Sequence, residues 1–281
     1  MAYLHILWDK PVDSGTYSGG DWVSGGGLSL DNLKTQDVME LARSTDASEA
    51  STQWRVDLGR VTPLSLFAIL NHNGSTLATR RFIVRDASLN AVYDTGAEVM
   101  RQPTVVWGSQ PFGSFPFSGV DETAYPGGPI DLHIAPATVV GRYIDVEISD
   151  EANSAGYFQA GRFLAGEAFQ QPMQYGVRIR PADPSEVRRT RGGRRLVRNL
   201  PGYRTFEAQF QCMSEEDAYG AAFEIERRLK KEGDFLLVYD PEDDPSVLFR
   251  RTIYAALVDT TGITEDFFKG YSWGLVAEEL I

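Results

Sequence analysis

Apolar and polar side chains alternate with a period of two over much of this chain, and that pattern predicts β-strands. At 54–59, Trp54, Val56 and Leu58 share one face, and a second alternating run lies at 141–150. The pattern recurs at short intervals, and no long helical pattern separates these runs in the first half of the chain. Many short strands at this spacing predict a β-sandwich.

The second half of the chain combines the strand pattern with a single helical pattern. Ser214 is a candidate N-cap, with Asp217 three residues later, and Gly233 is a candidate terminator. Between them the apolar residues recur at helical spacing, and these are Ala218, Ala222, Ile225 and Leu229. The sequence therefore predicts a helix at 215–232, preceded by two strands and followed by three.

A chain of 281 residues is longer than one hydrophobic core usually fills. We therefore expect two domains in a mainly β protein. Residues 1–168 should form a jelly-roll β-sandwich, and 169–281 a second β domain with helix 215–232 packed on it.

Composition excludes several classes of protein. The chain has 39 acidic and 27 basic residues and a formal net charge of −12, which argues against a general nucleic-acid or anionic-membrane binder. Its one cysteine cannot form an internal disulfide. We also expect no signal peptide and no membrane span, because the N-terminus lacks a basic region and no run approaches ~20 apolar residues. A protein made in the cytoplasm is the expectation.

The sequence shows no motif for a catalytic or cofactor site. It contains neither a nucleophile elbow nor a phosphate-binding loop, and its three histidines are not spaced as zinc ligands. We therefore expect a protein that is not an enzyme and uses no metal or cofactor. A carboxylate pair of the glycosidase type stays open, because acidic residues are numerous.

Two segments are candidate glycan-binding elements. Asn71, His72 and Asn73 end an apolar strand, where they either contact a ligand or fix a loop through side-chain hydrogen bonds. Trp107 lies in the Pro-, Gly- and Phe-rich segment 100–130, which is either a sugar-stacking platform or a plug over one end of the sandwich.

A basic segment is the candidate partner interface. It lies between two predicted strands and turns at Gly192–Gly193, so we expect a long, protruding hairpin loop. Three alternatives are open: pairing with an acidic face of a neighbouring subunit, nucleic-acid binding, or a solvated loop. The arginines are Arg188, Arg189, Arg191, Arg194, Arg195 and Arg198.

The segment around Trp54 resembles the galactose-binding-like, discoidin-type β-sandwich. The match is to Trp54, Asp57, Leu58 and Gly59, and the later run "GRYIDVEI" resembles another strand of that fold. The resemblance covers about residues 1–168. It implies a sandwich that can bind glycans and that often holds calcium.

The whole arrangement resembles distal-tail or baseplate proteins of long-tailed bacteriophages and prophages. The motifs are "NHN", "PFGSFPF", "GRYIDVEI" and "GRFLAGEAF", followed by the strand and helix order of the second half. This resemblance implies a structural subunit of the virion tail tip. Its C-terminal domain, 169–281, would be a tail-tube-like β-barrel with one flanking helix that forms a ring, six-fold by family expectation. Its partners would be copies of itself, the tail tube protein and the baseplate hub, and nucleic acid would only pass through the lumen. The alternative is a virion module that attaches to host surface glycans.

Overall fold

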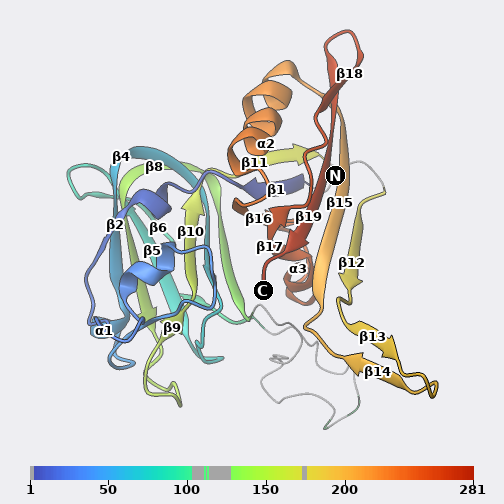
Figure 1. Ribbon diagram of the computed structural model, residues 1–281. Helices are drawn as coiled ribbons and strands as arrows, with labels where there is room; N and C mark the ends of the chain where they lie inside the picture. The colour runs from blue at the N-terminus through green and yellow to red at the C-terminus, as the bar shows by residue number, and fades with distance from the viewer. Residues whose placement is uncertain (1–2, 103–110, 112, 114–127, 173–175) are drawn as a thin grey trace. The chain divides into compact units, whose positions relative to one another are not determined.

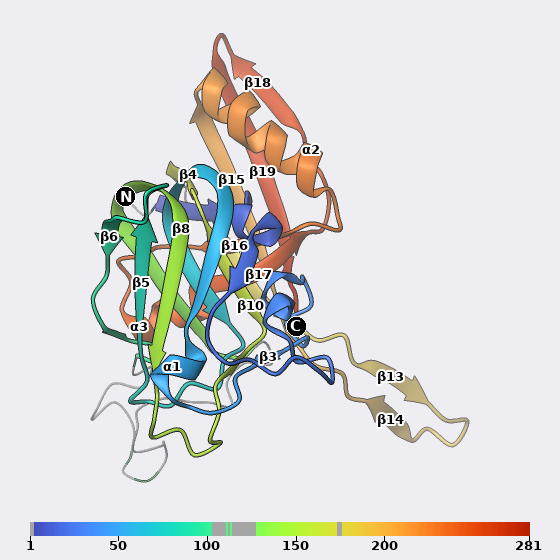
Figure 2. The ribbon, with the colours of Figure 1, turned by 90° about the vertical axis from the view of Figure 1, so that its left-hand side faces the viewer.

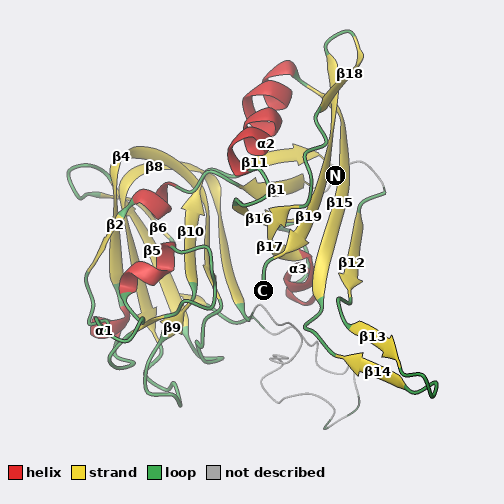
Figure 3. Ribbon diagram, in the orientation of Figure 1, coloured by secondary structure: helices red, strands yellow, loops and turns green. Residues whose placement is uncertain are grey.

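The computed structural model describes residues 3–102, 111, 113, 128–172 and 176–281 (Figure 1). The protein is mainly β, as predicted, with few and short helices (Figure 3). It forms two compact units. The sandwich unit comprises Asp9–Ala168 and Glu242–Phe249, and the sheet–helix unit comprises Met1–Trp8, Phe169–Pro241 and Arg250–Ile281.

The sandwich unit contains one antiparallel sheet with the strand order β10-β4-β8-β5-β6, in which β2 also pairs with β4 and β7 with β5. A separate pair, β3 and β9, three short helical segments and most of α3, Pro245–Arg251, also belong to it. The strands are β2 Thr16–Ser18, β3 Ala42–Arg43, β4 Trp54–Leu70, β5 Thr79–Arg85, β6 Ala91–Asp94, β7 Glu98–Val99, β8 Ile130–Ser149, β9 Gln159–Ala160 and β10 Arg162–Gly166. The helical segments are η1 Pro11–Ser14, η2 Leu30–Lys34 and α1 Glu49–Thr52.

The alternating run at 54–59 ends in an irregularity inside the single strand β4. Gly59 has a φ of +71°, which a residue with a Cβ rarely adopts. Its N–H donates to Asp57 Oδ1 at 2.8 Å, and Arg142 of β8 donates to the same carboxylate at 2.9 Å. The pairing with β8 shifts between Asp57 and Thr62 and then continues. The Asp-Leu-Gly motif therefore bends a strand that stays in the sheet.

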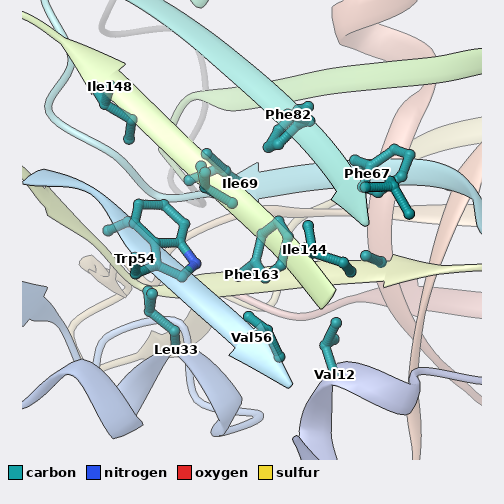
Figure 4. Close-up of a cluster of buried hydrophobic side chains, with 14 of the residues drawn as sticks. Val12, Leu33, Trp54, Val56, Phe67, Ile69, Phe82, Ile144, Ile148 and Phe163 are labelled. Carbon is teal, nitrogen blue, oxygen red and sulfur yellow. The ribbon is translucent and has the colours of Figure 1, made fainter. Parts of the chain in front are cut away.

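The inward faces of these strands enclose a core centred on Trp54 (Figure 4). Its indole packs edge-on against Trp22 and Phe163, with ring centroids 5.6 and 5.7 Å away. Phe67 and Phe82 stack at 5.3 Å. Trp54 and Phe67 lie at the two ends of β4, Phe82 in β5 and Phe163 in β10, so the core joins strands that are far apart in the sequence.

The sheet–helix unit contains an antiparallel sheet in the order β11-β1-β16-β17-β19-β15-β12, with β18 paired to β19. Its strands are β1 Tyr3–Leu7, β11 Phe169–Pro172, β12 Arg178–Ala182, β15 Tyr203–Met213, β16 Asp234–Val238, β17 Thr252–Leu257, β18 Ile263–Phe267 and β19 Gly270–Glu279.

The first strand lies outside the domain in which we expected it. Residues 1–8 were expected in the sandwich, but β1 pairs with β11 and β16, with His5 opposite Gln170 and Val238. The chain thus starts in the sheet of one unit, forms the other unit, and returns at Phe169. The alternating pattern of β1 predicts a strand, but it carries no information about which distant strand it pairs with.

The expected helix is present but shorter and less regular than 215–232. It runs through Glu216–Ala222 in π-helical geometry and then through α2, Phe223–Leu229. Ser214 caps it as predicted, because its Oγ accepts from Asp217 N at 3.1 Å. The helix ends at Lys230, where φ is +52°.

Three further details of this unit differ from expectation. The sheet is open rather than a closed barrel, because within the described residues its end strands β11 and β12 do not pair. Residues 248–251, which we expected at the start of a strand, form the end of α3, Pro245–Arg251, and the first five residues of α3 belong to the sandwich unit. Strand β18 has no clear alternation in sequence and was not expected.

Candidate functional sites

The six arginines lie on a two-stranded arm of the sheet–helix unit. Strands β13, Glu186–Arg189, and β14, Arg195–Arg198, pair with each other and with no other strand among those described. The arm continues the β12–β15 pair beyond the end of the sheet, and both views show it projecting away from that sheet (Figures 1 and 2). All its residues are exposed. The predicted protruding hairpin is therefore confirmed.

Each face of this arginine hairpin carries charge that its own chain does not neutralise. Arg189 lies directly opposite Arg195. Like charges at opposed positions destabilise a strand pair. Within the described part of the chain, the one ion pair of the arm joins Arg188 to Glu186 at 3.5 Å, and both groups are exposed. The arm therefore presents unpaired guanidinium groups to solvent.

The arginine hairpin also exposes apolar side chains. Val187 and Val197 oppose each other, Leu196 lies opposite Arg188, and about half of each apolar side chain is accessible. A two-stranded hairpin with no packed face is marginal in water. Mixed apolar and arginine surface is the composition typical of the centre of a protein interface.

The Asn71–His72–Asn73 corner is tied to neighbouring loops. Asn71 donates to Val38 O at 2.8 Å. Asn73 donates to Tyr157 O at 3.0 Å and accepts from Gln159 N at 2.8 Å. These bonds hold three loops at one end of the sandwich. They favour the loop-fixing interpretation, and glycan contact by these residues stays an untested prediction.

His72 lies inside this corner rather than on its surface. Only 3% of the residue is accessible, and its Nδ1 accepts from Gly74 N at 3.2 Å. Burial, together with the positive charge of Arg101, lowers the pKa of His72 to about 3. A neutral, buried imidazole cannot touch a ligand from solution without local opening. The remaining candidate, Trp107, lies outside the described residues, as does most of the aromatic segment around it.

The sandwich unit contains a polar cluster that sequence reasoning missed. Arg80 of β5 donates to Asp131 of β8 at 2.9 Å and also binds Glu98 of β7. His133 Nδ1 lies 3.0 Å from Glu98 Oε2, and His133 Nε2 lies 2.8 Å from the Tyr93 hydroxyl. Arg80 and Asp131 are buried, whereas the Glu98 side chain is 42% exposed. The chain of contacts therefore leads from the interior to solvent.

Burial controls the protonation states in this cluster. It raises the pKa of Asp131 to about 6, against the charge of Arg80, and it raises the pKa of Tyr93. It also lowers the pKa of His133, an effect to which Arg80 adds. Burial is the largest influence on Glu98 and raises its pKa, but the hydrogen bonds and charges of Arg80 and His133 together outweigh it, so the pKa of Glu98 is lowered. Neutral His133 thus donates through Nδ1 to Glu98 and accepts from Tyr93 through Nε2.

The contacts in this cluster hold the side chains in fixed orientations and do not activate Tyr93 as a nucleophile. A tyrosine nucleophile needs a lowered pKa, and that of Tyr93 is raised. What the cluster offers is a half-exposed carboxylate and a phenol held by fixed partners, which is suitable for hydrogen-bonding a neutral polar ligand. A signal was present in the sequence. Strand alternation places Arg80 on the same face as the buried Phe82, and Asp131 and His133 on the same face as the buried Ala135.

Other features give no ligand site. Among the described residues, no group of three or more His, Cys, Asp or Glu side chains could hold a metal. None of the described helices has the length and apolar character needed to cross a bilayer. A cleft of about 590 Å³ opens beside β15 and β19, but its Glu207 is bound by Arg180 and lies 3.9 Å from Arg178.

Comparisons with known proteins place the chain in no family. Neither a protein-family model nor a curated protein matches it. Among solved structures, a fucose binding module of Streptococcus pneumoniae is 12% identical, with a TM-score of 0.38 over 57% of this chain and 96% of that one. The lectin domain of lectinolysin, complexed with Lewis B antigen, is 12% identical, with a TM-score of 0.39 over 57% and 96%.

A third similar structure is the family 32 carbohydrate-binding module of Clostridium perfringens NanJ, in complex with galactose. It is 10% identical, with a TM-score of 0.38 over 58% of this chain and 98% of that one. Likenesses at this identity and TM-score leave open what this chain binds.

Proposed function

We propose that this chain is a structural subunit of a protein assembly, which it joins through the arginine hairpin. The observation that carries the proposal is the arm itself: six arginines and three exposed aliphatic side chains on a two-stranded hairpin that nothing in the described chain covers. Such a surface gains stability when acidic and apolar groups of a partner pack against it.

Among assemblies, we propose the tail tip of a long-tailed bacteriophage or prophage. Support comes from the resemblance of the sequence and from the division into a sandwich unit and a sheet–helix unit with an arm. In this role the chain forms a ring between the tail tube and the baseplate hub. It contributes binding surfaces and no chemistry.

Complementation in the bacterium or phage that encodes the chain tests this proposal. Removing the gene should give particles whose tail tubes lack a joined baseplate, seen by negative-stain microscopy. The full chain should restore them, whereas a chain with residues 186–198 replaced by a short Gly-Ser turn should not. Complete, infective particles without the gene would refute the tail-tip role.

A second candidate function is glycan binding by the sandwich unit. The polar cluster favours it, because Glu98 and Tyr93 are accessible and are held in place by His133 and Arg80. Carboxylates and phenols accept and donate hydrogen bonds to sugar hydroxyls, and a tyrosine ring offers a flat apolar face. The similar structures described above bind fucose, Lewis B antigen and galactose, so these sugars are the first probes.

Glu98→Gln tests the glycan site. It keeps the shape of the side chain but removes the charge, so we expect saturable binding of fucosyl or galactosyl oligosaccharides to weaken at least about tenfold, since a charge-assisted hydrogen bond is lost. Glu151→Gln changes an exposed carboxylate elsewhere in the same unit and should leave binding unchanged. Calorimetric titration that shows no saturable binding by the unaltered chain would exclude this function for these sugars.

A further inference from the structure

The sheet–helix unit has a second unusual surface, at the end opposite the arginine hairpin. The turn between β18 and β19 carries Phe267 and Phe268, which are 57% and 85% exposed. Tyr219 and Phe223, on the neighbouring helix, are each about half exposed. Large aromatic side chains this accessible, and this close together, mark an interaction surface.

The contacts show how these aromatic residues are arranged around the β18–β19 end. Tyr219 packs edge-on against Tyr271 at 5.4 Å and lies 6.3 Å from Phe223. Phe267 pairs with Gly270, the residue next to Tyr271, and its ring occupies the space where a Cβ on Gly270 would lie. Consecutive residues of a strand face opposite sides, so Tyr271 packs with the helix on one face of β19 and the ring of Phe267 lies on the other face. The aromatic residues therefore flank this end of the sheet on both faces.

Carboxylates surround this aromatic surface. Burial, and then the charges of Glu265 and Glu215, raise the pKa of Tyr271, so both carboxylates lie near its ring. Within the described chain, no Lys or Arg side chain forms an ion pair with any carboxylate of this group, which comprises Glu215, Glu216, Asp217, Glu265 and Asp266. Together with the four aromatic residues, they form what we term the acid–aromatic end.

We propose that the arginine hairpin of one copy docks on the acid–aromatic end of the next copy. This rests on the proposed assembly role and names the contact between its subunits. Guanidinium groups pair with carboxylates and stack on aromatic faces, and Val187, Leu196 and Val197 match the exposed rings. The two surfaces thus complement each other in both charge and apolar character.

The geometry requires the partner to be another molecule. Strand β15 starts at Tyr203, beside the hairpin, and ends at Met213, beside the acid–aromatic end. At ~3.4 Å per residue its two ends are about 34 Å apart. The hairpin projects away from the sheet, and the β18–β19 turn lies at the opposite end in both views (Figures 1 and 2). The arginine hairpin of one copy therefore cannot reach the acid–aromatic end of the same copy.

A contact between two different surfaces repeats from copy to copy. Such head-to-tail contacts give a closed ring when the rotation closes and an open filament when it does not. A ring is what a tail-tip subunit requires. Since the chain is strongly acidic overall, the basic hairpin also steers each copy toward the acidic end of another rather than toward a second hairpin.

Two charge-reversed variants test the contact. The hairpin variant is Arg189→Glu/Arg195→Glu, and the end variant is Glu265→Lys/Asp266→Lys. The unaltered chain should self-associate in sedimentation experiments at about 50 mM salt, and higher salt should weaken this association. Each variant alone should associate at least about tenfold more weakly, since like charges then face each other. All four residues are exposed, and circular dichroism checks that the variants fold.

Mixing the two variants gives the most specific outcome. The hairpin variant keeps a native acid–aromatic end and the end variant keeps a native hairpin, so an equal mixture should associate again, with the two variants alternating in a one-to-one ratio. The chain that carries all four substitutions should self-associate again, because its charges are exchanged. Trypsin should cut the arm more slowly in each associated sample. The control Glu40→Lys/Glu151→Lys makes the same charge change on exposed residues of the sandwich unit and should behave as the unaltered chain.

Two outcomes would overturn the proposal. If the unaltered chain associates but the mixed variants do not, the contact lies elsewhere or joins identical surfaces. If the unaltered chain stays monomeric at low salt up to about 1 mM, where weak specific contacts become populated, copies do not bind in this way. Neither result affects the complementation experiment, so failure of this contact is distinguishable from failure of the tail-tip role.

Discussion

Replacing Arg162 with methionine should destabilise the sandwich unit by about 3–5 kcal/mol, the usual cost of removing one partner from a buried charged network. Arg162, in β10, is 1% exposed. It donates to Lys34 O and Thr35 O, both at 2.6 Å, and to Asp13 Oδ2 at 2.9 Å. Methionine fills similar volume but leaves two carbonyl groups and a carboxylate without these donors.

Urea unfolding, with hydrogen exchange to assign the transition to the sandwich unit, measures this loss. The free energy of unfolding of Arg162→Lys should lie between that of Arg162→Met and that of the unaltered chain, because one ammonium group cannot reproduce the planar fork of the guanidinium. The exposed Arg189→Met is the matched control and should change stability by less than about 0.5 kcal/mol. A loss below about 1 kcal/mol for Arg162→Met would show that water or a rearranged loop replaces the arginine.

Acid should destabilise the sandwich unit through His72, by about 3 kcal/mol between pH 7 and pH 4. The folded-state pKa of His72 is lowered to about 3 from an ordinary value of 6.5. The unfolded chain therefore binds a proton in this range and the folded chain does not. The contribution of His72 is complete above pH 6.5, and it is lost as the pH falls toward 3.

Asp131 changes the stability with pH in the opposite direction, so the variants of His72 and of Asp131 are each compared with the unaltered chain. Its folded-state pKa is raised from 3.8 to about 6. Its contribution is therefore complete below pH 3.8 and is lost as the pH rises through 6. In urea unfolding at a series of pH values, His72→Gln should flatten the loss of stability on acidification, and Asp131→Asn should steepen it. Parallel pH profiles for His72→Gln and the unaltered chain would show that His72 is protonated without unfolding.

Local sequence predicted the elements whose stabilising contacts are local. The alternation at 54–59 and at 141–150 predicts buried faces that lie in β4 and β8. Ser214 and Asp217 mark the start of the helix, because a cap is formed within one turn. Clustered arginines around Gly192–Gly193 predict an exposed hairpin, since so many like charges cannot be buried together.

The candidate sites depended on contacts between residues far apart in the sequence. The sheet brings together Glu98, His133 and Tyr93, which come from β7, β8 and β6. No local sequence pattern predicts which residues of these strands lie side by side. The partners of Asn71 and Asn73 are carbonyl and amide groups of loops 33 to 86 residues away. Side-chain type predicted that these asparagines would bind backbone, but not which loops they would hold.

The sequence by itself determined that this is a mainly β protein of two parts, with one capped helix and a basic arm, because period, capping and charge density act over a few residues. Only the tertiary structure decided that β1 joins the sheet of the second unit and that Arg162 links β10 to η1 and η2. It also decided that Glu215 and Glu265 lie near Tyr271 of β19, which packs against Tyr219 of the helix. Strand pairing and core packing bring these groups together, and both depend on the whole chain rather than on any one segment.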